Sequence, residues 1–176
     1  MAVLIEGISV VVRLDSVANK MPGGWAQFES LVPNQTLCAD TEIARVGFMT
    51  PQDVKSFVEK LRACGLEFLR DGEAIDIAVA DQMRGLTSGC SWLEFGHQSM
   101  GDDGPRVAVC RLAGSEIMDL ATPADWTFEE SLSATFGFVP TEHLGKALKF
   151  VRREGNMDVY LNSLTGKEVF VGRTGG

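Results

Sequence analysis

The feature that most constrains the fold is an apolar, mostly β-branched run at residues 3–13. Successive side chains of a strand point to opposite faces, so Val10 and Val12 share one face and Val11 lies on the other. Because both faces carry valine, the run predicts a central strand that is covered on both sides. Such a chain must build layers on each side of a sheet.

The clearest helix is predicted at residues 50–64. Thr50 can cap its start, Pro51 suits the first helical position, and Gly65 suits the residue after its end. An apolar stripe with helical spacing lies between these residues, at Val54, Phe57, Val58 and Leu61. Other helices are predicted at residues 24–31, at a short segment that starts at Thr122 or Thr127, and at residues 141–154.

Hairpin signals account for most of the remaining chain. Asp71-Gly72 separates two extended segments, and an Asp-Gly pair favours a tight β-turn. The strands are expected at residues 36–38, 42–49, 66–69, 74–80, 90–97, 106–112, 157–161 and 167–171. This pattern predicts an α+β fold with a largely antiparallel or mixed sheet and helices packed on one face. We expect an acidic core domain at residues 1–140, with a helix plus hairpin at residues 141–176 packed on the same domain.

Charge excludes some classes of partner. The chain has 16 basic and 24 acidic residues, a net charge of −8. Nucleic acid and anionic membranes bind cationic proteins, so neither is expected. Residues 141–176 differ, with six basic and four acidic residues. That excess either complements helix dipoles or forms a basic docking patch.

The location is predicted to be cytoplasmic. The first residues lack the basic and apolar regions of a signal peptide. Cys38, Cys64, Cys90 and Cys110 lie in apolar surroundings without metal-ligand spacing, which indicates buried free thiols in a reducing compartment.

Known catalytic motifs are absent from the sequence, including GxGxxG, GxxxxGK[ST], GxSxG and HExxH. His97 and His143 are the two available imidazole bases. We expect His143 to be exposed in the first turn of a helix and His97 to be a polar strand terminus. The patterns predict no metal and no cofactor.

Six residues are candidates for a ligand-binding site: Trp25, Asp76, Asp81, Trp92, Glu94 and His97. Burial of Glu94 beside Trp92 would raise the pKa of its carboxyl group and make it a general acid. The alternative is a carboxylate that is solvated or paired with an arginine.

Residues 43–96 resemble half of a vicinal-oxygen-chelate (glyoxalase-like) module. The resemblance lies in the strand Ala44-Arg45-Val46-Gly47-Phe48, the helix that begins at Pro51, and the late strand Trp92-Leu93-Glu94-Phe95. It implies a metal ligand at Glu94. The family's first-strand ligand falls on Ala44 or Arg45, neither of which can serve as that ligand.

Three functions follow as hypotheses. The first is a binding or interaction domain for a basic protein partner, to which an acidic surface would be electrostatically complementary. The second is a small-molecule-binding protein or a glyoxalase-like enzyme. The third is a homo-oligomer in which residues 141–176 reach across a neighbouring subunit.

Overall fold

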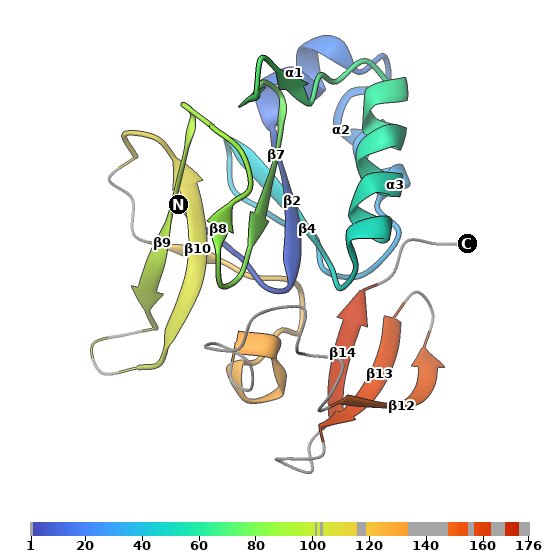
Figure 1. Ribbon diagram of the computed structural model, residues 1–176, viewed down its shortest axis with the longest axis vertical. Coiled ribbons are helices and arrows are strands. Elements are labelled where there is room, and N and C mark those ends of the chain that lie inside the picture. The colour runs from blue at the N-terminus through green and yellow to red at the C-terminus, as the bar shows by residue number, and fades with distance from the viewer. Residues whose placement is uncertain are drawn as a thin grey trace.

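The computed structural model describes residues 2–100, 102, 104–115, 119–133, 148–154, 157–162 and 168–172. Two β-sheets pack face to face, and helices cover the outer face of one of them (Figure 1). The predicted α+β class, with mostly antiparallel strands and helices on one face, is confirmed. A separate three-stranded sheet lies beyond one end of this sandwich (Figure 1).

The helical elements are α1 (Leu14–Lys20), α2 (Gly24–Leu31), α3 (Pro51–Ala63) and the 3-10 turn η1 (Phe128–Glu130). The strands of the first half are β1 (Ala2–Leu4), β2 (Ile8–Arg13), β3 (Cys38–Ala39), β4 (Ile43–Phe48), β5 (Leu69–Arg70), β6 (Glu73–Ala74), β7 (Ile77–Asp81) and β8 (Gly85–Leu86). The later strands are β9 (Leu93–Ser99), β10 (Arg106–Leu112), β11 (Leu120–Ala121), β12 (Leu148–Glu154), β13 (Met157–Asn162) and β14 (Glu168–Gly172).

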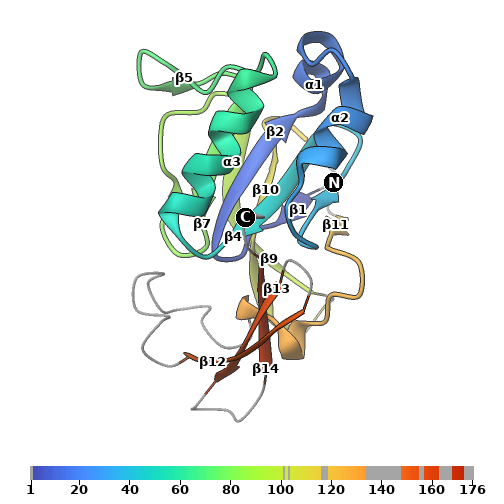
Figure 2. The same ribbon diagram turned by 90° about the vertical axis from the view of Figure 1, so that its right-hand side faces the viewer.

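The central sheet has five strands in the order β3-β4-β2-β7-β8. Val10 and Val12 of β2 face the helices, where they pack with Phe28 of α2 and Phe57 of α3. Helices α2 and α3 lie in front of this sheet in Figure 2. The predicted burial of both faces of residues 8–13 is confirmed, because Val11 packs on the opposite face.

A four-stranded sheet, in the order β11-β1-β10-β9, covers that opposite face. Strand β1 is antiparallel to β10 and parallel to β11. Val3 and Cys110 point inward, toward Val11 of the central sheet. Leu4 and Val109 point outward, where Trp126 packs against them. Residues after β11 therefore cover the outer face of this second sheet.

Residues 3–13 form two strands instead of the single strand that their composition predicts. Strand β1 belongs to the four-stranded sheet and β2 to the five-stranded sheet. The chain changes sheet at Gly7, whose φ is +60°. A Cβ atom there would lie 2.5 Å from the carbonyl oxygen of Phe48, so the crossing depends on glycine. The alternation of side chains is continuous through this bend and cannot reveal it.

Two local predictions are confirmed. Helix α3 begins after Thr50, whose Oγ1 accepts a hydrogen bond from the Asp53 amide at 3.2 Å. Strands β5 and β6 form a hairpin around Asp71 and Gly72, which have φ of +52° and +80°. Positive φ at both central residues is the geometry that an Asp-Gly turn favours.

The helix predicted at residues 141–154 is wrong where the structure describes it. Residues 148–154 form β12, which pairs antiparallel with β13. Their apolar residues also fit helical spacing, but the ladder with β13 satisfies the backbone in extended form, and tertiary pairing overrides the local pattern. Residues 141–147 lie outside the described residues. The predicted hairpin of β13 and β14 is confirmed, whereas the division at residue 140 stays a prediction.

Candidate functional site

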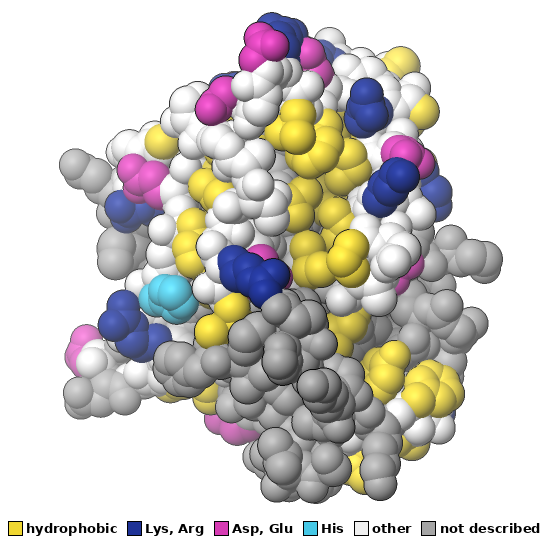
Figure 3. Space-filling view, in the orientation of Figure 1, with side chains coloured by type: hydrophobic (Ala, Val, Ile, Leu, Met, Phe, Trp, Pro, Cys, Tyr) yellow, Lys and Arg dark blue, Asp and Glu magenta, His cyan; other side chains and the backbone are white. Residues whose placement is uncertain are grey.

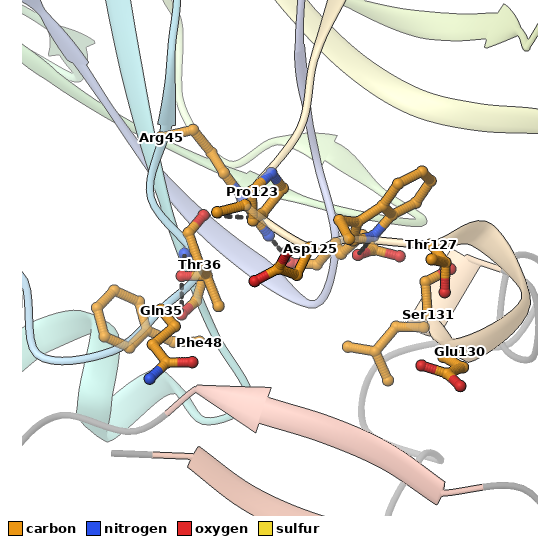
Figure 4. Close-up of a pocket in the computed structure, with 14 residues that line it drawn as sticks. Gln35, Thr36, Arg45, Phe48, Pro123, Asp125, Thr127, Glu130 and Ser131 are labelled. Atoms are coloured by element: carbon orange, nitrogen blue, oxygen red, sulfur yellow. Dashed lines mark hydrogen bonds between the residues drawn. The ribbon is translucent and has the colours of Figure 1, made fainter. Parts of the chain in front are cut away.

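A cavity of about 320 Å³ opens between the β3–β4 side of the central sheet and residues 123–132 (Figure 4). This volume is at the lower end of the range of about 300–1,000 Å³ that is usual for small-molecule sites. Three separate parts of the chain line it: the link between β1 and β2, residues 35–48, and residues 123–132. Figure 4 shows Thr36 and Arg45 on one side of the cavity and Glu130 and Ser131 on the other.

Arg45 is the most unusual residue of this cavity. It extends from the middle of β4 and is only 2% exposed. Its Nε donates to Ser9 Oγ at 2.9 Å, one terminal nitrogen donates to the carbonyl of Thr36 at 3.1 Å, and the other to the carbonyl of Glu6 at 2.9 Å. No carboxylate forms an ion pair with Arg45 in the described part of the chain. Since a guanidinium is always charged, a buried positive charge is held by neutral acceptors alone.

Gly47 provides the space for that guanidinium. Arg45 and Gly47 are two residues apart on β4, so they lie on the same face of the strand. A Cβ atom at Gly47 would lie 2.3 Å from a terminal nitrogen of Arg45. The amide of Gly47 donates to Thr36 Oγ1 at 2.7 Å, and its carbonyl accepts from Asn34 Nδ2 at 2.9 Å. The loop before β3 is thereby fixed against β4.

The carboxylate of Glu6 holds the opposite wall of the cavity, formed by residues 123–132, through hydrogen bonds. It is buried in the link between β1 and β2 and accepts from Trp126 Nε1 at 2.8 Å. Its other oxygen accepts from the amide and the hydroxyl of Ser133, each at 2.6 Å. Three donors compensate this buried carboxylate, so it holds residues 126–133 in place without needing Arg45.

The rim combines apolar and acidic side chains. Phe48, Pro123 and Leu132 contribute apolar surface. Asp125 and Glu130 also line the cavity and are exposed. Asp125 has a φ of +60° within a tight turn, a conformation that aspartate tolerates better than most residues. The site therefore offers one buried cation, an apolar wall and carboxylates at its edge.

Asp76, a sequence candidate, does not line this cavity and has a structural role. It accepts from Ser16 Oγ at 2.6 Å, from Lys20 Nζ at 2.7 Å and from the Glu67 amide at 2.7 Å. Burial alone would raise the pKa of Asp76, but the hydrogen bonds from Lys20, Ser16 and Glu67 outweigh it and hold the pKa below its ordinary value. A carboxylate that stays ionised under these donors joins α1 to the strands and is poorly suited to be a general acid.

The candidates on β9 and directly before it occupy different environments. Trp92 is buried and donates from Nε1 to the carbonyl of Ala74 at 3.0 Å. Glu94 is exposed and forms an ion pair with Arg111 at 2.8 Å, which is the alternative of a paired carboxylate. His97 is exposed, and its ring stands edge-on to another aromatic ring at 5.5 Å. Glu94 and His97 border the same hollow along β9, whereas Trp92 does not.

Trp25 and Asp81 complete the sequence candidates and lie apart from each other. Trp25 is 40% exposed on α2 and donates to Glu29 at 3.0 Å. Asp81 ends β7 and accepts from the amides of Met83 and Arg84 at 2.8 and 3.1 Å. None of the six candidates lines the cavity at Arg45. His143, the second predicted imidazole, lies outside the described residues.

A second hollow follows the face between β7 and α3, where Figure 3 shows hydrophobic side chains along the middle of the molecule. Val54, Val58 and Val79 supply its apolar lining. Its buried acidic residue, Asp81, already accepts from two backbone amides. This groove is concave, but among the described residues it presents no buried charge that a ligand would compensate. The cavity at Arg45 is therefore the stronger candidate.

The four cysteines are free thiols, and Cys38 and Cys110 are buried. Burial raises the pKa of Cys110 to about 12 and also raises the pKa of Cys38. A thiol is nucleophilic as its thiolate, so the two buried side chains are poor nucleophiles near neutral pH.

The described residues contain no group of three or more His, Cys, Asp or Glu side chains that could hold a metal ion. The glyoxalase-like resemblance places its two ligand positions on the strands at residues 44–45 and at Glu94. The structure puts these strands in different sheets. Arg45 itself is a buried cation whose side chain only donates hydrogen bonds, so it does not fit the role of a metal ligand.

Sequence reasoning missed Arg45 and Glu6 as site residues. Each is a charged residue inside an otherwise apolar segment, and that interruption is the signal that could have identified them. The basic protein partner and the homo-oligomer remain predictions. No family model, curated protein or solved structure gave a significant match to the chain. Among the described helices, none has the length and apolar character needed to cross a membrane.

Proposed function

We propose that this protein binds a small carboxylate-bearing molecule in the cavity at Arg45. The observation that carries the proposal is the buried guanidinium of Arg45, which faces the cavity without a carboxylate partner among the described residues. Taking an ion out of water costs several kcal/mol, and an opposite charge offsets this best when it also forms good hydrogen bonds. A bound carboxylate supplies both.

The hydrogen-bond count of Arg45 supports this ligand chemistry. A guanidinium has five N–H groups, and Arg45 donates three hydrogen bonds to protein acceptors. Among the described residues, no acceptor takes the second N–H of either terminal nitrogen. Two such groups match the two oxygens of a carboxylate, the two-point contact for which arginine is suited. The apolar wall at Phe48 and Leu132 would hold the hydrocarbon part of the molecule.

The test uses 4-methylpentanoate, which has one carboxylate and a short branched chain. Isothermal titration calorimetry measures its dissociation constant, and amide chemical shifts locate the site. We expect the largest shifts at Thr36, Arg45 and Gly47. The variant Arg45→Lys keeps the charge but loses the fork of donors. Loss of one charge-assisted hydrogen bond of about 1.5–3 kcal/mol corresponds to about 10–150-fold weaker binding.

A second variant covers the case in which Arg45→Lys fails to fold. Ala124 lines the cavity and is exposed, so Ala124→Trp should fill the cavity at little cost in stability. We expect it to abolish binding. Absence of binding to the wild-type protein, or equal affinity in Ala124→Trp, would overturn the proposal.

A further inference from the structure

The carboxylates on the cavity wall narrow the class of ligand. Among the residues that the structure describes, the lining contains a single cation, Arg45, together with Glu6, Asp125 and Glu130. Three donors already compensate Glu6. Asp125 and Glu130 have no ion-pair partner within the ranges that the structure describes. The buried end of the cavity thus carries Arg45 beside a Glu6 carboxylate that is already hydrogen-bonded, and the exposed rim carries two carboxylates.

The close-up shows how these charges are arranged. In Figure 4 Arg45 extends from β4 toward the cavity, Asp125 lies near its middle, and Glu130 lies on the far side beside η1. A molecule that fills the cavity from Arg45 to Glu130 passes Asp125. Opposite charges attract each other more strongly in such a partly enclosed cavity than in bulk water, because the effective dielectric constant is lower. An anion at Arg45 that also carries a cationic group beside its carboxylate would be complementary to Arg45 and to Asp125.

The same charges disfavour other anions. Phosphate carries up to two negative charges and needs several cations or backbone N–H groups around it. Here one guanidinium with two remaining N–H groups faces three carboxylates. A molecule with only cationic groups would meet the buried positive charge of Arg45. A zwitterion avoids both conflicts.

Size and wall chemistry complete the assignment. The volume of about 320 Å³ lies at the lower end of the range of about 300–1,000 Å³ that is usual for small-molecule sites. That suits a molecule of the size of one amino acid better than a peptide. Phe48, Pro123 and Leu132 form the apolar part of the wall. We infer that the ligand is a free amino acid with an apolar side chain, its carboxylate on Arg45 and its ammonium group on the side of Asp125. This inference rests on the proposed function.

Three probes of matched shape test it by isothermal titration calorimetry. Leucine carries both charged groups, 4-methylpentanoate lacks the ammonium group, and 3-methylbutylamine lacks the carboxylate. We expect leucine to bind up to about 5-fold more tightly than 4-methylpentanoate, because one exposed ion pair with Asp125 contributes about 0.2–1 kcal/mol. We expect 3-methylbutylamine to bind the most weakly. Inorganic phosphate should bind more weakly than 4-methylpentanoate.

The double variant Asp125→Asn with Glu130→Gln identifies the cause of the preference. Both side chains are exposed, so the protein should fold normally. In this variant leucine and 4-methylpentanoate should bind equally, and the affinity for 4-methylpentanoate should not fall. The substitution Glu59→Gln, on the exposed face of α3, is the control for a general change of charge and should leave the preference intact.

The outcomes separate the two proposals. Equal binding of leucine and 4-methylpentanoate to the wild-type protein overturns the amino-acid inference and leaves the carboxylate site standing. A preference for leucine that survives in the double variant also overturns the inference. If neither probe binds, or if 3-methylbutylamine binds more tightly than 4-methylpentanoate, the carboxylate site itself is wrong.

Discussion

Replacing Gly47 by alanine should destabilise this protein, although alanine normally stabilises the interior of a strand. Alanine loses less backbone entropy on folding than glycine, which favours it by about 0.5–1 kcal/mol. At Gly47, however, the new Cβ atom would lie 2.3 Å from a terminal nitrogen and 2.8 Å from Cζ of Arg45. Since these atoms are the nearest neighbours, the guanidinium must move.

The cost follows from the hydrogen bonds that the movement breaks. The terminal nitrogens of Arg45 donate to the carbonyls of Thr36 and Glu6. Hydrogen bonds of charged groups are worth about 1.5–3 kcal/mol each. The guanidinium can turn into the adjacent cavity and regain part of its solvation. We therefore expect a net loss of about 2–4 kcal/mol, or a melting temperature lower by about 4–16 °C for a chain of 176 residues.

Urea unfolding followed by circular dichroism measures this change, and two comparisons test its cause. Gly96→Ala, on β9, places a Cβ atom in open space and should be neutral or slightly stabilising. In an Arg45→Met background the three clashing atoms are absent, so Gly47→Ala should no longer destabilise. Equal stability of Gly47→Ala and the wild-type protein would refute the reasoning. A cost that is the same in both backgrounds would refute it as well.

Three further predictions concern single positions outside the cavity. Asp76→Asn should make the protein less stable than the wild type above about pH 5. The difference in free energy of unfolding should shrink as the pH falls below 3.8, because the folded state, in which the pKa of Asp76 is lowered, favours its ionised carboxylate and protonation removes that contribution. Urea titrations at several pH values measure this difference. Thr50→Ala should cost about 1 kcal/mol by removing the cap on the Asp53 amide, whereas Thr50→Ser should retain most of it. Gly65→Ala should cost about 3 kcal/mol or more, because Gly65 has a φ of +111° and its Cβ atom would lie 2.6 Å from the carbonyl oxygen of Lys20; a smaller loss on thermal unfolding would contradict that packing.

The sequence predicts elements whose signals are short in range. Helix α3 is an example, because its cap at Thr50 and its apolar stripe lie within fifteen residues. The turn at Asp71-Gly72 is another, since two adjacent residues determine its backbone. In both cases the interactions that determine the local structure lie within the segment itself.

Prediction failed where a local pattern permits two structures. Residues 148–154 fit helical spacing, but pairing with β13 makes them a strand. Residues 3–13 alternate like one strand, yet the bend at Gly7 divides them between two sheets. In each case the deciding interaction comes from a partner that is distant in sequence or from the close approach of another backbone segment. The periodicity of hydrophobic residues does not encode such interactions.

The candidate site depends on tertiary structure to the greatest extent. In the sequence, Glu6 and Arg45 are single charged residues in apolar segments, 39 positions apart. The change of sheet at Gly7 and the pairing of β2 with β4 bring the Glu6 carbonyl to the Arg45 guanidinium. Trp126 and Ser133 then close the cavity through the Glu6 carboxylate. Composition and spacing determine that charges are buried here, but only the packing of three distant segments decides that they face one cavity.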